Sequence, residues 1–272
     1  PPRAVGLTLV SPPLTGATGS TGSRSAGLSL KAAADRAGKP IYLEMSSVNP
    51  IFVLPGALRE RLTQVANELY NSCSLGAGQF CTNPGLAIVM DNEEGRAFLR
   101  EVQRFFEANP AGILLGESGV KSISEGVGVL TAHGAQVVTG GREVEGPGYC
   151  YANTLLSVPG EDFLKNPQAL QTEAFGTVHL MVMARDAGQM VRIAEELEGN
   201  LTGCFYSHTQ GEDDALYDLV EPVLRQKVGR LLNDKMPTGV AVGPSLDHRG
   251  AFPGPRPPGV SPEGVPPPPV DV

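Results

Sequence analysis

The sequence predicts an α/β fold with a doubly wound, mostly parallel sheet. Stretches with helical apolar spacing alternate along the chain with short apolar runs of strand length. Repeated units of this kind form parallel sheets with helices on both faces. A length of 272 residues can bury a core large enough for one large or two small domains.

The first helix and strand are expected between residues 28 and 45. Apolar residues recur at helical spacing from Leu28 to Ala37, and Gly38 followed by Pro40 ends this pattern. The apolar run 41–45 comes next and predicts a short buried strand.

The same two patterns continue to residue 232. Apolar runs predict strands at 51–54, 86–90, near Val137, and at 149–157, 178–184, 201–206 and 230–232. Helical spacing predicts helices at 58–70, 93–108, 120–131, 186–197 and 214–228.

The two ends of the chain depart from this alternation. Residues 1–27 are rich in Gly, Ser, Thr and Pro, a composition that favours turns and exposed loop. Nine of the 21 residues from 252 to 272 are proline, so this segment cannot form a packed element. A disordered tail and an out-of-frame translation both fit its composition.

Composition and residue spacing exclude several classes of partner. Acidic residues outnumber basic ones by 29 to 21, and the net charge of -8 disfavours binding to nucleic acid. No apolar run reaches the roughly eighteen residues that cross a bilayer, so no membrane role is expected. The histidines lack metal-ligand spacing, so no metal is expected. The four cysteines show no C-x-x-C spacing, and reduced thiols in a cytoplasm fit best.

Cys81 is the first candidate for chemistry. It lies on a loop between a glycine pair and Pro84, after one predicted helix and before a strand. Such a loop exposes the sulfur, and a nearby helix terminus lowers the pKa of a thiol, as nucleophilic catalysis requires. The alternative is a small buried core residue, the commonest environment of a free cysteine.

Glu44 is the second candidate. It follows the apolar residues of a predicted strand, where a buried carboxylate would be costly and its pKa would rise. Such a group suits general-base catalysis near neutral pH. An exposed charge at a strand end explains the same pattern equally well.

Four motifs resemble those of the aldehyde dehydrogenase superfamily, in the family's order. They are GSRSAG at 22–27, EMSSVNP at 44–50, GQFCT at 78–82 and EAFG at 173–176. The two serines after Glu44-Met45 and the nearby Pro84 most resemble α-ketoglutarate semialdehyde (2,5-dioxopentanoate) dehydrogenases. VGRLLN at 228–233 and PTGV at 237–240 extend the similarity.

The resemblance implies an oxidoreductase that converts an aldehyde, here α-ketoglutarate semialdehyde, to its carboxylate. Cys81 would attack the aldehyde to give a thiohemiacetal, and loss of hydride would leave a thioester. Glu44 would activate the water that hydrolyses this thioester.

The resemblance also implies NADP or NAD as cofactor. Glu173 would bind the nicotinamide ribose and Phe175 would pack beside the nicotinamide. Gly22 and Ser23 would approach the pyrophosphate, with helix 27–37 presenting its N-terminus. A plain flexible loop remains an alternative for this Gly/Ser-rich stretch. Members of the family are usually homo-oligomers.

The same resemblance divides the chain into three parts. Residues 1–48 are interpreted as the remnant of a Rossmann-like dinucleotide-binding domain, 49–242 as the catalytic domain and 243–272 as a Pro-rich disordered or aberrant tail. Residues 4–8 look like the strand before the phosphate turn, with 9–20 as extra residues. The family's oxyanion-hole asparagine and first strands would lie upstream, so the fragment alone is expected to be inactive as a dehydrogenase.

Two other functions compete with this interpretation. A cysteine hydrolase would pair Cys81 with a histidine base, but no G-x-S-x-G motif occurs and nothing marks His133 as a partner. The second alternative is a non-catalytic α/β remnant that acts as an interaction module, because fold resemblance assigns ancestry better than present activity.

Overall fold

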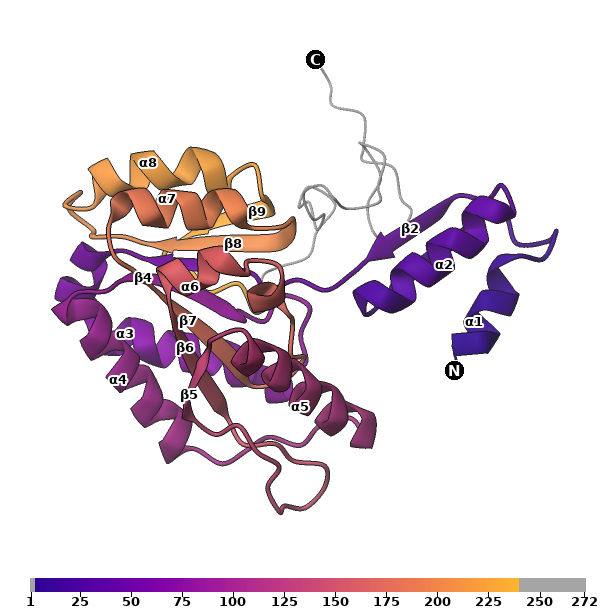
Figure 1. Ribbon diagram of the computed structural model, residues 1–272, viewed down its shortest axis with the longest axis horizontal. Coiled ribbons are helices and arrows are strands. Elements are labelled where there is room, and N and C mark those ends of the chain that lie inside the picture. The colour runs from indigo at the N-terminus through magenta and orange to yellow at the C-terminus, as the bar shows by residue number, and fades with distance from the viewer. Residues whose placement is uncertain (1–2, 240–272) are drawn as a thin grey trace.

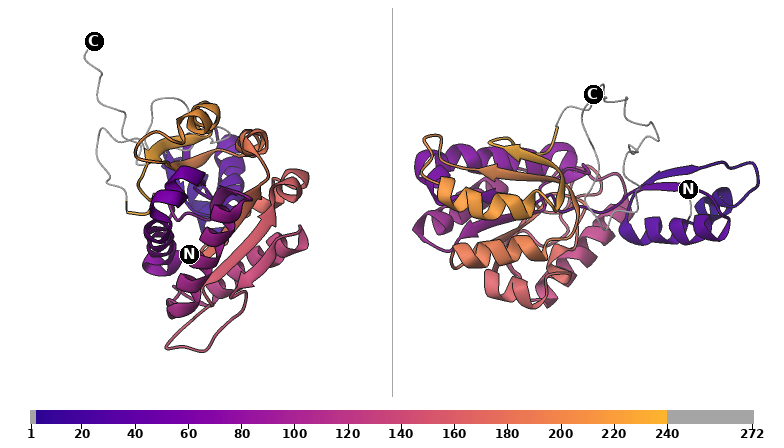
Figure 2. Two further views of the ribbon diagram at one scale, coloured as in Figure 1. Left: turned by 90° about the vertical axis from the view of Figure 1, so that its left-hand side faces the viewer. Right: turned by 90° about the horizontal axis from the view of Figure 1, so that it is seen from above.

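The computed structural model describes residues 3–239 and contains two structural units. A large unit with a central sheet is joined to a small N-terminal unit, which projects from one end (Figures 1 and 2). The predicted tail at 243–272 lies outside the described residues. Within residues 3–239, no helix combines the length and apolar character needed to cross a membrane.

The large unit is built on a sheet of seven strands in the order β5-β6-β7-β4-β3-β8-β9. Only β5 and β6 pair antiparallel, and every other neighbouring pair is parallel. This confirms the predicted α/β class with a mostly parallel sheet. The strands are β3 (Ile51–Val53), β4 (Leu86–Met90), β5 (Gln136–Thr139), β6 (Thr154–Pro159), β7 (Val178–Ala184), β8 (Asn200–Tyr206) and β9 (Val228–Asn233).

Helices cover both faces of this sheet, which is therefore doubly wound. One face packs on α3 (Pro55–Ser74) and α4 (Glu93–Ala108). The other packs on α5 (Glu117–Ala132), α6 (Gly160–Lys165), α7 (Ala187–Glu196) and α8 (Asp214–Leu224). The central strand β3 is fully buried: Ile51 and Val53 enter the first core and Phe52 the second. Each such side chain stabilises the fold by about 1.5–3 kcal/mol.

The small unit shows that the interpretation of residues 1–27 as loop was wrong. It contains α1 (Arg3–Val10), β1 (Thr18–Thr21), α2 (Arg24–Arg36) and β2 (Ile41–Glu44). Strand β1 has the sequence TGST and no apolar pattern, and it forms by parallel backbone pairing with β2. Val10 of α1 packs with Ala33, Ala34, Ile41 and Leu43.

The strand expected at 4–8 is also wrong. These residues lie in α1, and the strand that precedes the turn at 22–23 is β1. Backbone pairing explains the difference, because β1 takes the place beside β2, where it runs from Thr18↔Ile41 to Thr21↔Glu44. Residues 4–8 instead belong to α1, which packs against α2.

Several element boundaries and short helices differ from the sequence prediction. Helix α3 extends the predicted 58–70 at both ends, from Pro55 to Ser74, with proline in its first turn. Helix α8 ends at Leu224 instead of 228, because turn residues 225–227 lead into β9. Helix α6 and the 3-10 turns at 75–78 and 169–171 had not been predicted, since each is too short to show a period.

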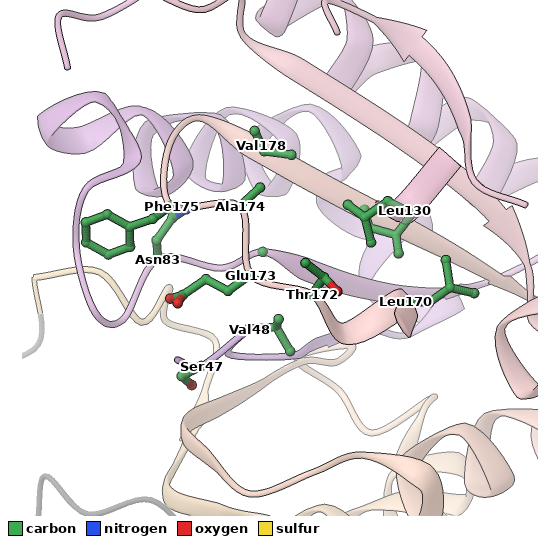
Figure 3. A pocket seen from close by; sticks show the side chains of 12 residues that line it. Ser47, Val48, Asn83, Leu130, Leu170, Thr172, Glu173, Ala174, Phe175 and Val178 are labelled. Carbon is green, nitrogen blue, oxygen red and sulfur yellow. The ribbon is translucent and has the colours of Figure 1, made fainter. Parts of the chain in front are cut away.

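Four loops meet at the amino edge of the sheet. Strand β3 follows residues 45–50, β4 follows 79–85, β7 follows 172–177 and β8 begins at Asn200. Because these strands are parallel neighbours, the segments before them lie side by side, and Figure 3 shows Val48, Asn83 and Glu173 together there. The N-terminal unit joins the sheet at this edge, through 45–50.

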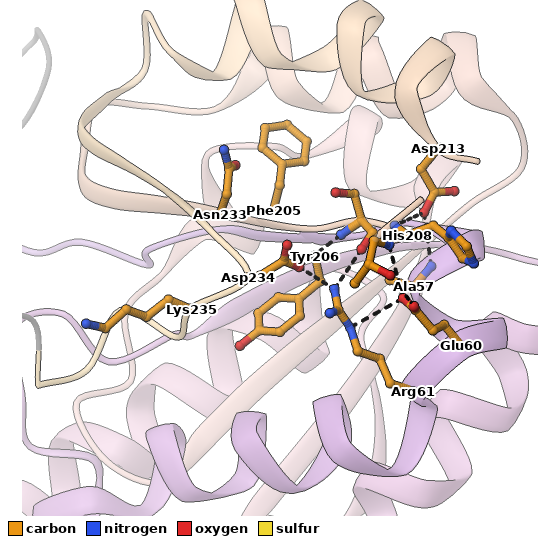
Figure 4. Close-up of polar contacts among 12 residues, drawn as sticks. Ala57, Glu60, Arg61, Phe205, Tyr206, His208, Asp213, Asn233, Asp234 and Lys235 are labelled. Atoms are coloured by element: carbon orange, nitrogen blue, oxygen red, sulfur yellow. Dashed lines mark hydrogen bonds and ion pairs between the residues drawn. The ribbon is translucent and has the colours of Figure 1, made fainter. Parts of the chain in front are cut away.

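At the opposite, carboxyl edge, Asp213 stabilises the start of α3. The residue at the N-cap of α3, Leu54, offers no side-chain acceptor. The Asp213 carboxylate instead accepts the N–H groups of Gly56 at 2.8 Å and Ala57 at 3.0 Å, and also that of His208 at 2.8 Å (Figure 4). A buried carboxylate from the α8 side therefore caps a helix on the other side of the sheet.

We predict that Asp213→Ala lowers the free energy of unfolding by about 1–3 kcal/mol, because buried N–H groups at the start of α3 lose their acceptor. Urea unfolding followed by circular dichroism measures the change. The matched control is Asp218→Ala, at an exposed position in α8, which is expected to stay within about 0.5 kcal/mol of wild type. Equal effects of the two substitutions would contradict the capping role.

Candidate active site

Cys81 is the most accessible of the four thiols. It is half-buried on the loop of residues 79–84, here called the Cys81 loop, whereas Cys73, Cys150 and Cys204 are buried. Burial raises the pKa of Cys73 far above its usual range and that of Cys204 to about 12. These two thiols therefore stay protonated and unreactive at neutral pH.

The amide of Asn49 holds two carbonyls of the Cys81 loop. Its Nδ2 donates to the carbonyl of Cys81 and to that of Asn83, both at 2.9 Å. Asn49 is fully buried and has a φ of 46°, in the left-handed region where asparagine is favoured over most other residues. The segment before β3 thus fixes the loop that carries the thiol.

The other two carbonyls of residues 81–84 are also bound by side chains. The Thr238 hydroxyl donates to Thr82 O at 3.3 Å. Pro84 O accepts His179 Nδ1 at 2.8 Å and Cys73 Sγ at 3.3 Å. Every carbonyl from 81 to 84 therefore accepts a side-chain donor, which restricts the backbone from Cys81 to the start of β4.

Asn49 is itself held by β8. Its Oδ1 accepts the Thr202 N–H at 3.2 Å, the Thr202 hydroxyl at 2.9 Å and the Ser47 hydroxyl at 2.9 Å. The side chain of Asn200 supports the same turn, because its Oδ1 accepts the N–H groups of Val48 at 2.8 Å and Asn49 at 3.1 Å. Both the nitrogen and the oxygen of the Asn49 side-chain amide are thus hydrogen-bonded.

A close backbone approach joins the Cys81 loop to the segment 173–176. Gly78 has a φ of 72°, and a Cβ added there would lie 2.1 Å from the carbonyl carbon of Gly176. Asn83 Nδ2 also donates to Gly176 O at 3.1 Å. Only glycine fits at 78, so the GQFCT motif begins with a residue that the packing requires.

Glu173 lies in a small pocket at this edge, lined also by Ser47, Asn83 and Phe175 (Figure 3). Burial raises the pKa of its carboxyl group, the charge of Glu44 adds to this rise, and hydrogen bonds from the Ser46 hydroxyl and the Ser47 N–H oppose it. Glu173 and Glu44 are thus close enough to interact electrostatically.

Ser46 connects Glu173 to the small unit. Its Oγ accepts the N–H of Arg24 at 3.3 Å, in the first turn of α2. Ser23 precedes this turn as N-cap and accepts the Ala26 N–H at 3.4 Å. The helix therefore begins at 24 instead of 27, with residues 22–23 directly before it.

Glu44 is buried, with 8% of its surface exposed, at the end of β2. Its carbonyl accepts the Gly22 N–H at 3.0 Å, so the turn at 22–23 is tied directly to the start of the 44–50 segment. The alternative of an exposed charge at a strand end is wrong.

The structure brings the segments of all four sequence motifs together at one edge. Two described histidines make other contacts: His133, the C-cap of α5, donates its Nδ1 proton to Val129 O, and His179 is bound to Pro84 O. The sequence did not identify the linking roles of Asn49, Asn200 and His179. For His179 a signal existed, because an imidazole is unexpected within the apolar run 178–184.

Comparison with known proteins shows which sequences this chain is similar to. A sequence model of the aldehyde dehydrogenase family matches residues 1–218. The chain is 36% identical, over 97% of its length, to α-ketoglutaric semialdehyde dehydrogenase 2 of Azospirillum brasilense. It is 32% identical, over 92% of its length, to α-ketoglutaric semialdehyde dehydrogenase of Acinetobacter baylyi. These alignments cover 50% and 47% of the two relatives, so the chain spans about half their length.

The fold is similar to that of solved structures. A 1-pyrroline-5-carboxylate dehydrogenase from Thermus with bound NAD superimposes with a TM-score of 0.73 at 24% identity. The match covers 90% of this chain and 48% of that one.

We predict that His179 makes the fold sensitive to acid. Burial lowers its pKa from 6.5 to about 4, so between these pH values the unfolded chain binds a proton that the folded chain does not. Its contribution to stability is complete above pH 6.5 and is lost as the pH falls towards 4. Between pH 7 and pH 5 the loss is about 2 kcal/mol.

Urea unfolding of wild type and His179→Leu at both pH values isolates this contribution, because all other titrating groups are shared. The variant is expected to lose less stability than wild type on acidification. Equal losses in the two proteins would show that His179 titrates normally in the folded state.

Proposed function

Because the chain belongs to the aldehyde dehydrogenase family, we propose that this protein oxidises an aldehyde to its carboxylate with NADP or NAD, through a covalent intermediate on Cys81. The observation that carries the proposal is the Cys81 loop itself. It presents the one half-buried thiol of the chain, and side chains bind the carbonyls of residues 81–84. Such fixed geometry is what nucleophilic attack requires.

The proposed reaction begins with attack of the Cys81 thiolate on the aldehyde carbon. An S–C bond forms and the carbonyl electrons move to oxygen, which gives a thiohemiacetal oxyanion. When bound, the nicotinamide cofactor would accept the hydride that leaves this carbon, and the product on Cys81 is a thioester. Glu44 then removes a proton from water, the hydroxide adds to the thioester, and the C–S bond breaks to release the thiolate and the carboxylic acid, which loses its proton to solvent and becomes the carboxylate.

The residues at the amino edge fit a nicotinamide nucleotide. A carboxylate has about four acceptor positions, and Glu173 uses two for the Ser46 hydroxyl and the Ser47 N–H, so two remain for ribose hydroxyls. Phe175 is 38% exposed beside the pocket and offers a ring face. Gly22 and Ser23 directly precede α2, and a helix N-terminus attracts anions, which supports a role of these two residues in binding the pyrophosphate.

We assign α-ketoglutarate semialdehyde as the substrate class from the two relatives that carry this activity in their names. We propose that residues 1–48 are the remnant of the dinucleotide-binding domain and that residues 49–242 form the catalytic domain, which carries the nucleophile. We also propose that the protein forms a homo-oligomer and that it is located in the cytoplasm.

We predict that Cys81 reacts first with a limiting amount of iodoacetamide at neutral pH, because Cys73 and Cys204 are buried with raised pKa values and Cys150 is buried. Mass-spectrometric mapping of the alkylated peptides gives the order. Cys81→Ser is the control and should remove the fast phase of labelling. Preferential labelling of one of the other three thiols in the wild-type protein would overturn the assignment of Cys81.

We predict that Glu44→Gln slows deacylation of Cys81 more than acylation, because the proposed base acts on the hydrolytic water. With 4-nitrophenyl acetate, which needs no cofactor, the burst of nitrophenolate should survive while the steady-state rate falls roughly 100-fold. Glu125→Gln, at an exposed position on α5, is the matched control and should change neither phase. If burst and steady state fall together in the Glu44 variant, this carboxylate has another role.

A further inference from the structure

His179 is a polar residue in an apolar place. It lies on β7 between Val178 and Leu180, and its side chain is completely buried. An imidazole in such a position lowers stability unless it is hydrogen-bonded. The mechanism proposed above does not use it.

Among the described residues, the carbonyl of Pro84 is the partner that explains why a histidine stands at this buried position. Nδ1 lies 2.8 Å from Pro84 O, so this nitrogen carries the proton and donates it. Nε2 is then a buried acceptor, and within residues 3–239 no donor reaches it. The short hydrogen bond of the ring is therefore the one directed at the end of the Cys81 loop.

A second donor reaches the same carbonyl from the other direction. Cys73 Sγ, on α3, lies 3.3 Å from Pro84 O and 3.7 Å from His179 Nδ1. A thiol is a weak donor, so the imidazole supplies the stronger of the two bonds. Pro84 is thus held between a helix on one face of the sheet and a strand within it.

Pro84 determines where the Cys81 loop ends. Proline has no N–H, so its carbonyl oxygen is its only backbone group for hydrogen bonding. The next residue, Gly85, is already fixed, because its N–H donates to Val48 O at 2.9 Å and its carbonyl accepts the Leu180 N–H at 2.9 Å. Without the His179 bond, the Pro84–Gly85 peptide group would be held only by the Gly85 N–H and by the weaker Cys73 thiol.

We infer that His179 is a positioning residue for Cys81, which holds the Pro84 carbonyl and thereby sets the path of the loop that carries the thiol. The inference rests on the proposed function, in which Cys81 is the nucleophile. A small displacement of a reacting group lowers its rate strongly, so the acylation rate is the property that His179 controls.

Two substitutions separate positioning from simple core packing. In His179→Asn the amide nitrogen stands at the same number of bonds from Cα as Nδ1, so it keeps the donor to Pro84 O. In His179→Leu a methyl group of similar size replaces that donor, and the buried acceptor Nε2 disappears as well. His179→Gln is a third variant, whose amide nitrogen lies one bond too far from Cα.

The test measures the burst rate constant of Cys81 acylation by 4-nitrophenyl acetate in the 272-residue chain, with urea unfolding of each variant at neutral pH. We expect the burst in His179→Leu to be about tenfold slower or more. His179→Asn should retain a rate within about threefold of wild type, which the loss of a packing role alone does not predict. If the Leu variant does not fold, His179→Gln takes its place with the same expectation.

Equal burst rates in wild type and His179→Leu, or in wild type and His179→Gln, would overturn the inference, as would a rate in His179→Asn as low as in His179→Leu. Peptide mapping of the acetyl group in the wild-type protein is done in parallel. An acetyl group on a thiol other than Cys81 would instead refute the proposed function, so the two failures are distinguishable.

Discussion

The amide side chain of Asn49 is the interaction on which the site depends. Its nitrogen binds the carbonyls of Cys81 and Asn83, and its oxygen accepts Ser47 and Thr202. One buried group therefore joins the segment that follows Glu44, the Cys81 loop and a central strand. A buried amide that satisfies both its donor and its acceptor restricts the site to one geometry, whereas a half-satisfied amide would be costly.

This constraint explains why the site lies at the amino edge of the sheet. Ligands of open α/β sheets usually bind beyond the carboxyl ends of the strands. Here the carboxyl edge is occupied by structural contacts such as the Asp213 cap of α3. The amino edge is where the small unit joins, and Ser46 links its helix α2 to Glu173. The nucleophile and the cofactor-binding residues of the proposed function thus meet at the junction of the two units.

The sequence predicted most of the fold because the large unit depends on apolar periodicity, as in β3 and α4. It failed where backbone pairing or tertiary contacts decide the structure: β1 (TGST) has no apolar pattern and forms by pairing with β2. Within the candidate site, motif resemblance predicted roles for Cys81, Glu44 and Glu173. It did not reveal the contacts of Asn200 and His179, because their partners lie more than 90 residues away along the chain. For His179 the only signal was an imidazole within an apolar run.

The most direct test of this account is native-state hydrogen exchange of the Cys81 loop in Asn49→Ala. The amides of Asn83 and Gly85 are the reporters, since they donate to Phe80 O and Val48 O, and α4 reports any global loss of stability. The account predicts that exchange at the two loop amides accelerates at least about tenfold more than exchange in α4. Equal acceleration of the loop and α4 would contradict it, because the loop would then hold its conformation without the Asn49 amide.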